Sequence, residues 1–241
     1  MKNFLQTSLL SIFLIGCSSI DYAELTSSVS PSKTQIDRII ALNLSHMESL
    51  KEANKLTDPA LASTVVKELE ARKLIADNEI IDAEKVASFA EMVKVSDGNF
   101  KFMGPKISEI KKRNMMGKPE NVDYFLLGVK NKNNGLLQHK LSLSITYTSK
   151  ERRNYTLASF CDKWGNCDEE VPQDINIISS NASNCSFSDC DYTAIMELNL
   201  SDDFLRNNTK EGLSIKFNSK NATNKIAITS EYLRGYLKVA N

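Results

Sequence analysis

The sequence predicts an α+β fold, in which an N-terminal helical segment precedes an antiparallel β-sandwich of the immunoglobulin-like type with two local disulfides. Two apolar patterns and the distribution of cysteines carry this prediction. Apolar residues recur at three- and four-residue steps between residues 36 and 93, whereas they alternate strictly with polar residues over residues 141–147. Four of the five cysteines lie in the second half of the chain, after this alternating stretch. A partly open barrel is the alternative arrangement of the strands.

The helical segment is expected over residues 35–97. Its first helix carries apolar residues from Ile36 to Leu50, and Asp58-Pro59 then has the pattern of an N-cap followed by proline at the first helical position. A second helix continues to Ile75, and a third covers residues 80–93. The stretch 96–99 (Ser-Asp-Gly-Asn) is expected to end this half of the chain as a turn.

The second half, residues 98–241, is expected to form the β-sandwich from about seven short strands. A turn at residues 131–135 separates the first two strands, and Ser201 caps a short helical turn that Gly212 ends. A short helix after Ser230 is expected to cover an apolar edge. The apolar positions that define the strands are Phe125, Leu127 and Val129; Leu141, Leu143, Ile145 and Tyr147; Tyr155 and Leu157; Tyr192, Ala194, Met196, Leu198 and Leu200; Leu213, Ile215 and Phe217; and Ile226 and Ile228.

The first 16 residues have the pattern of a secretory signal. Lys2 supplies a short positive region, residues 9–15 are largely apolar, and the small Gly16 precedes Cys17. The apolar stretch is too short to span a bilayer core, which takes about 20 apolar residues. An ordinary cleaved signal or a short membrane anchor is the alternative interpretation.

The stretch Leu14-Ile15-Gly16-Cys17 resembles the lipobox of bacterial lipoproteins, and the resemblance covers only this N-terminal region. It implies that, after cleavage, Cys17 carries a thioether-linked diacylglycerol and that its amine is acylated, for example with palmitate. Three acyl chains would give stable attachment, so the membrane is an expected partner. Ser18 and Ser19 follow, whereas enterobacterial lipoproteins kept at the inner membrane have Asp there. We therefore expect the outer membrane, facing the periplasm, with residues 17–34 as the lipidated cysteine and a flexible tether.

Charge and length limit the classes of function. Cleavage removes Lys2 and no acidic residue, which leaves 29 basic against 30 acidic residues in 225. No basic patch suggests nucleic-acid binding. The remaining length suits one large domain or two small ones.

Cys161, Cys167, Cys185 and Cys190 form two close pairs in the β half. An even count in an oxidising compartment predicts disulfides, and four cysteines allow three pairings. We favour 161–167 and 185–190, because each pair flanks a turn-like stretch. A Cys₄ zinc site is the alternative, although the spacings are looser than in zinc knuckles. The stretch 185–197 is similar to β domains of uncharacterised Gram-negative secreted proteins; this loose resemblance covers about residues 140–240 and implies no activity.

Trp164 is the only tryptophan and lies inside the first cysteine loop. On a rigid loop it could serve as an exposed binding anchor. The alternative is a side chain folded back over its own disulfide or a neighbouring strand.

No catalytic or metal-binding motif is found. His46 lies on the first amphipathic helix and His139 flanks a strand, and neither has an identifiable nucleophile as a partner. Neither the nucleotide-binding and hydrolase motifs nor the spaced acidic loop of a calcium site occurs, so no cofactor or metal is expected.

Two functions therefore remain. The first is a non-enzymatic envelope lipoprotein that binds or scaffolds an envelope protein. The second is a periplasmic enzyme inhibitor or defence factor that uses the Trp164 loop. An enzyme ranks third.

We expect Cys17→Ser to abolish lipidation and to leave an unprocessed or mislocalised precursor, because the thiol is the group to which the resemblance attaches the diacylglycerol through a thioether bond. Labelling with a fatty-acid analogue, followed by membrane fractionation, measures this. Equal labelling of the variant and the wild type would end the lipoprotein interpretation.

Overall fold

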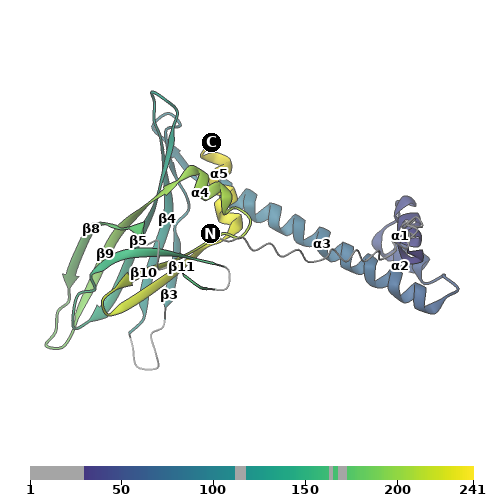
Figure 1. Ribbon diagram of the computed structural model, residues 1–241, viewed down its shortest axis with the longest axis horizontal. Helices are drawn as coiled ribbons and strands as arrows, with labels where there is room; N and C mark the ends of the chain where they lie inside the picture. Colours follow the sequence, from purple (N-terminus) through teal and green to yellow (C-terminus); the bar gives the residue numbers. More distant parts are fainter. Residues whose placement is uncertain (1–29, 112–117, 163–164, 168–172) are drawn as a thin grey trace, which may run out of the picture. The chain divides into compact units, whose positions relative to one another are not determined.

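The computed structural model describes residues 30–111, 118–162, 165–167 and 173–241, and it contains α-helices and antiparallel β-sheets (Figure 1). The chain divides into two compact units, Met1–Leu74 and Ile75–Asn241. The division falls inside helix α3 (Pro59–Met92) and not at Gly98, the expected boundary. The reason is that the second half of α3 packs within the unit that contains the sheets.

The first unit contains α1 (Pro31–Ala41), α2 (His46–Ala53) and the N-terminal part of α3. Its small core is entirely helical and comprises Ile36, Ile39, Ala53, Val65 and Leu69. The expected tether extends too far, since Ser30 already caps α1 by accepting the Lys33 amide hydrogen bond and Pro31 occupies the first turn.

Two other expectations about the helices are wrong. The first helix is interrupted after Ala41, and Ser45 caps the start of α2. In this capping box the Glu48 amide donates to the Ser45 hydroxyl, and the Ser45 amide donates to the Glu48 carboxylate. The two later helices are one helix of 34 residues, α3. Because no glycine or proline follows Pro59 before Met92, nothing in the backbone forces a break near Asp77. Asp58 accepts hydrogen bonds from the amides of Ala60 and Leu61, as expected for a cap.

The second unit contains two antiparallel sheets, with more strands than the seven expected. One has the order β1-β2-β4-β5-β9-β8, with β3 also paired to β4, and the other has the order β11-β10-β6-β7. The strands are β1 (Lys94–Ser96), β2 (Lys101–Met103), β3 (Ile107–Lys111), β4 (Glu120–Lys130), β5 (Leu137–Ser149), β6 (Tyr155–Cys161), β7 (Gln173–Asp174), β8 (Asn176–Ser183), β9 (Cys190–Ser201), β10 (Leu213–Ser219) and β11 (Ala222–Ile228).

Both sheets contribute to one hydrophobic core, and α4 (Asp202–Asn207) and α5 (Ser230–Val239) add to it. The alternating residues of β5 and β9 face inward as predicted. In β4 the strand is confirmed, but its face is reversed: Val122, Tyr124 and Leu126 are buried, whereas Val129 is exposed. Both faces of β4 are apolar, so the alternation there does not identify the inner face.

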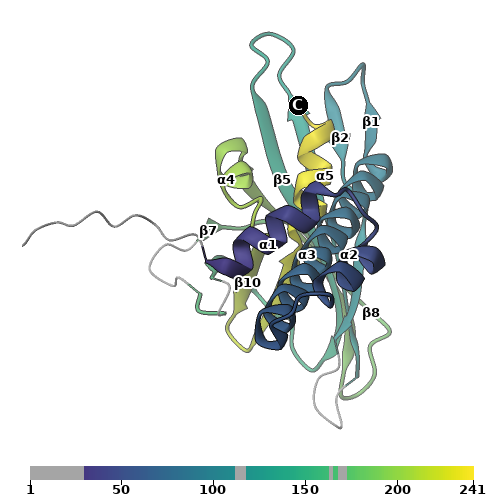
Figure 2. The same cartoon turned by 90° about the vertical axis from the view of Figure 1, so that its right-hand side faces the viewer.

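Helix α5 packs closely on the C-terminal part of α3 (Figures 1 and 2). Gly235 permits this approach, because a Cβ atom there would lie 2.6 Å from the Phe89 Cβ and 2.8 Å from the Val86 carbonyl oxygen. The Phe89 and Tyr232 rings meet edge to face with centroids 5.3 Å apart. Arg234 also forms an ion pair with Asp82.

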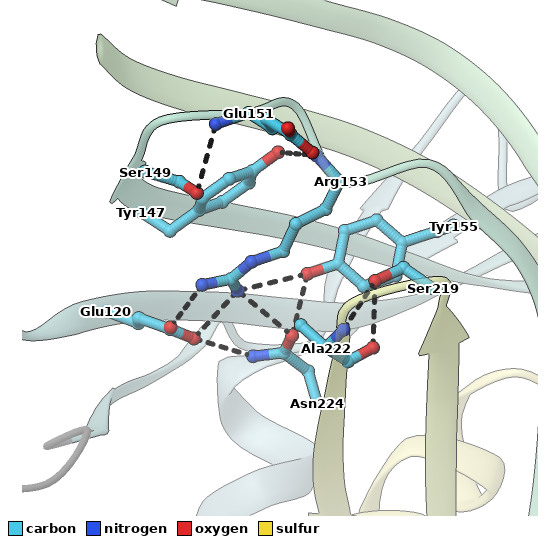
Figure 3. A network of polar contacts seen from close by, with 9 residues as sticks. All are labelled: Glu120, Tyr147, Ser149, Glu151, Arg153, Tyr155, Ser219, Ala222 and Asn224. Carbon is cyan, nitrogen blue, oxygen red and sulfur yellow. Dashed lines mark hydrogen bonds and ion pairs between the residues drawn. The ribbon is translucent and has the colours of Figure 1, made fainter. Parts of the chain in front are cut away.

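A buried polar network joins strands of the two sheets (Figure 3). Arg153 lies where the chain passes from β5 to β6, and its guanidinium contacts both carboxylate oxygens of Glu120 at 2.5 and 3.1 Å. Asn224 on β11 donates to Glu120 at 3.0 Å and accepts from Tyr155 at 2.6 Å. The Arg153 amide donates to the Tyr147 hydroxyl, and its guanidinium lies 4.0 Å from the centre of that ring.

We expect Gly235→Ala to lower the melting temperature. Alanine favours a helix over glycine by about 1 kcal/mol, but the clash involves backbone atoms of α3 and costs about 1–3 kcal/mol. Thermal unfolding followed by circular dichroism measures the effect. Lys238→Ala, at an exposed position of the same helix, is the matched control and should change stability by less than about 0.5 kcal/mol. An unchanged melting temperature for Gly235→Ala would contradict the tight α3–α5 contact.

Candidate functional site

The four cysteines form the two expected local disulfides. Cys161 bonds to Cys167 and Cys185 bonds to Cys190, with S–S distances of 2.02 and 2.07 Å. The sulfurs are therefore not the free thiolates that a zinc site requires. The other sequence-predicted site residues, Cys17 and Trp164, lie outside the described residues.

The first disulfide closes a short loop after β6. At its two ends, the Asp162 amide donates to the Asn166 carbonyl oxygen at 2.8 Å, and the Asn166 amide donates to the Asp162 carboxylate at 2.8 Å. The Gly165 amide also donates to the Asp162 carbonyl oxygen. The ends of the loop that contains Trp164 are thus held by a covalent bond and by several hydrogen bonds.

The second disulfide closes the turn of the β8–β9 hairpin. Within this turn the Ser186 amide donates to the Asp189 carbonyl oxygen at 2.7 Å, and the Asp189 amide donates to the Ser186 hydroxyl at 3.3 Å. Phe187 lies between these two residues and is fully exposed. A large aromatic side chain presented on a fixed turn is the kind of residue that supplies much of the energy of protein interfaces.

The strand beside this turn, β8, forms one edge of the seven-stranded sheet (Figure 1). Within the described ranges, β9 is its only partner strand. Residues 175–188 contain no charged side chain, and Ile177 and Ile178 are 43% and 52% exposed. Edge strands are usually protected by lysine, proline or a bulge, and only the last device is present here, between Ile177 and Ser179. Beyond the bulge, residues 179–183 have no strand on their outer side among the residues that the structure describes.

We call the uncharged residues 175–188 together with the Cys185–Cys190 disulfide the stapled hairpin. It combines an open main-chain edge, exposed isoleucines and one fully exposed aromatic ring. Such a surface can pair with an extended segment of another protein while Phe187 enters an apolar pocket. Residues 175–188 contain serine hydroxyls but no His, Lys, Asp or Glu side chain that could activate them.

His139 lies in the core, not in a cleft. Its Nε2–H donates to the Asp202 carboxylate at 3.0 Å, and its Nδ1 accepts from the Tyr236 hydroxyl at 2.9 Å. Burial lowers the pKa of His139, and the interaction with Asp202 offsets only part of this effect. Burial also raises the pKa of Tyr236. A Cβ atom on Gly128 would lie 2.4 Å from the Tyr236 hydroxyl oxygen, so no space for a substrate adjoins that hydroxyl on the β4 side. We therefore interpret the triad as structural.

Other kinds of site are not supported by the part of the chain that the structure describes. No group of three His, Cys, Asp or Glu residues there is placed to hold a metal ion. The helices in these ranges do not combine the length and the low polarity that a bilayer crossing requires. No family model, curated protein or solved structure matches the chain.

Phe187 has no role in the predictions from the sequence. Residues 186–189 are expected there only as a turn between paired cysteines, and Trp164 is the expected aromatic anchor. Two signals were available: a phenylalanine surrounded by Ser, Asp and Cys within a six-residue disulfide ring, and the uncharged run 175–188. An apolar aromatic in such a short ring has no core to enter.

We expect the free energy of unfolding to fall as the pH decreases below about 6.5, in part because of His139. The unfolded chain binds a proton at His139 near its ordinary pKa of about 6.5, whereas the folded chain, whose pKa is lower, stays neutral there. His139→Gln keeps a donor and an acceptor, and it should reduce the slope of stability against pH between about pH 5 and 7. Urea unfolding at a series of pH values measures the slope.

Leu205→Ala is the control for this series. The substitution removes buried apolar surface from α4, the helix that contains Asp202, without removing a titrating group. The variant should therefore be less stable but retain the wild-type slope of stability against pH. Equal slopes for His139→Gln and the wild type would show that the histidine titrates alike in both states.

Proposed function

We propose that this chain is an envelope lipoprotein that binds another envelope protein without catalysing a reaction. The lipobox at Cys17 supports the anchoring to the membrane, with the outer membrane facing the periplasm as the location. The observation that carries the binding role is the stapled hairpin, on which Phe187 is fully exposed beside an unprotected strand edge. The partner would contribute an extended segment and an apolar pocket.

The finer description of the fold belongs to the same proposal. We infer that the two sheets form a sandwich of the immunoglobulin-like type, because residues of both sheets join one core and one polar network. A sandwich leaves its hairpins free at the ends of the strands, where binding residues of such domains are commonly found.

A second function is favoured by the Cys161–Cys167 loop. Because its ends are held by a disulfide and by the hydrogen bonds between Asp162 and Asn166, the loop is suited to present Trp164 to the cleft of an enzyme. The chain would then be a periplasmic inhibitor or defence factor. The same capture experiment separates the two functions, since each depends on a different aromatic residue.

We expect Phe187→Ala to reduce capture of the partner about tenfold or more. The melting temperature should not fall, because the ring is fully exposed and makes no contribution to the core. The bait is the soluble chain of residues 18–241, immobilised and exposed to detergent-solubilised envelope extract, with bound proteins identified by mass spectrometry. The affinity for the purified partner is then measured with each variant.

Two matched variants complete the experiment. Leu136→Ala removes an exposed apolar side chain from the β4–β5 turn and should leave binding unchanged. Trp164→Ala tests the inhibitor alternative. If Trp164→Ala abolishes capture while Phe187→Ala does not, the stapled hairpin is not the binding site. If no envelope protein is captured reproducibly, the binding role itself is rejected.

A further inference from the structure

An open depression of about 480 Å³ lies on the face of the seven-stranded sheet that points away from the core. Its position follows from the strand register. The buried residues of β4 and β5 are Val122, Tyr124 and Leu126, opposite Leu141, Leu143 and Ile145, so the neighbouring odd positions of β4 and even positions of β5 project from the other face. The depression involves different residues from the stapled hairpin.

The floor of the depression is apolar and its rim is basic. Met103, Leu127 and Val129 form a continuous apolar floor, since Met103 pairs with Leu127 across β2 and β4 and Val129 lies two residues further along the same face. Val129 remains 49% exposed. Three lysines stand around this floor, and they are Lys94, Lys101 and Lys140.

The rim cations are only partly neutralised. Lys140 forms an ion pair with Glu197 at 2.8 Å, whereas Lys101 is 3.6 Å from Asp97, a carboxylate that Lys132 also contacts at 3.2 Å. Lys94 has no ion pair with any of the residues described. With Glu197 as the single acidic residue of the lining, the depression carries a net positive charge.

We propose that this depression binds a small amphipathic anion, with an aliphatic body on the floor and one carboxylate or phosphate group between Lys94 and Lys101. The volume lies within the range of small-molecule sites, roughly 300–1,000 Å³. The aliphatic body would displace water from the apolar floor. The lysines would pair with the negative charge of the head group. The lining comes from paired strands, so the site exists before the ligand arrives and does not depend on the lipid anchor or on a protein partner.

The test measures binding of defined probes to the soluble chain of residues 18–241 by two-dimensional NMR and isothermal titration calorimetry. Decanoate and decyl phosphate carry both a chain and a negative charge, 1-decanol carries the chain alone, and butanoate carries the charge with a short chain. We expect decanoate or decyl phosphate to bind most tightly and to shift the amide signals of Leu127 and Val129. The ratio of the two affinities identifies the preferred head group.

Two variants separate the contributions of the rim and the floor. The double substitution Lys94→Gln/Lys101→Gln should weaken the anionic probes about tenfold, at about two- to fivefold per lysine, and leave 1-decanol unchanged. Val129→Glu places a negative charge on the half-exposed floor and should abolish binding of the anions while the chain stays folded. Lys150→Gln/Lys220→Gln, at exposed loop positions, is the charge-matched control.

Three results would overturn the proposal. One is that none of the probes shifts the floor amides up to its solubility limit. Another is that the control variant weakens decanoate as much as the rim variant, which would indicate nonspecific attraction. The third is that 1-decanol and decanoate bind equally to the wild type, which would mean that the lysines do not recognise the head group.

Discussion

The passage of the chain between the two sheets depends on one buried ion pair. Arg153 and Glu120 are each about 4% exposed at the side chain, so neither charge is solvated by bulk water. Burial lowers the pKa of the guanidinium, and the hydrogen bonds with Glu120 and Tyr155 raise it, so that the net shift is upward. Removing one member of such a pair typically costs 3–5 kcal/mol, because the other is left as an uncompensated buried charge. The acceptors of Arg153 come from β4, β6 and β11. A single register of these strands satisfies all of them, so the network selects the arrangement of the sheets as well as stabilising it.

Once the inner faces are fixed in this way, the outer surfaces are free of packing constraints. Apolar residues on them then call for an explanation other than the core. Scattered exposed apolar side chains are normal in soluble proteins. Phe187, however, is fully exposed on a disulfide-closed turn, and Met103, Leu127 and Val129 adjoin one another in a depression with lysines around it. Each of these apolar sites adjoins a second feature, a strand edge beside Phe187 and positive charge around the depression. This combination distinguishes them from the scattered apolar side chains elsewhere on the surface.

The features that could be predicted from the sequence are those determined by short-range patterns. The strict alternation from Leu141 to Tyr147 gave the inner face of β5, and the close cysteine spacing gave both disulfides. The prediction failed where two patterns compete. Both faces of β4 are apolar, so periodicity alone could not choose between them. The expected gap between Ile75 and Ile80 is largely polar (Asp77, Asn78 and Glu79), but polar residues without glycine or proline are tolerated inside a helix. Long-range contacts such as Arg153 with Glu120 leave no local signal at all, since the partners are 33 residues apart.

In the proposed binding role, the disulfides would contribute more to recognition than their small effect on stability suggests. Each closes a ring of only a few residues, and the chain-entropy estimate for such rings is about 2 kcal/mol. Their effect is local: they remove conformations of the turns that they close. If Phe187 binds a partner as proposed, this would matter more for binding than for folding, because ordering a flexible loop at an interface costs about 0.5–1.5 kcal/mol for each immobilised side chain. A turn that is already ordered avoids that cost. The same reasoning explains why the stapled hairpin can dispense with charge. Its specificity would come from a fixed shape and from main-chain hydrogen bonds along residues 179–183, which do not require charged side chains on either partner.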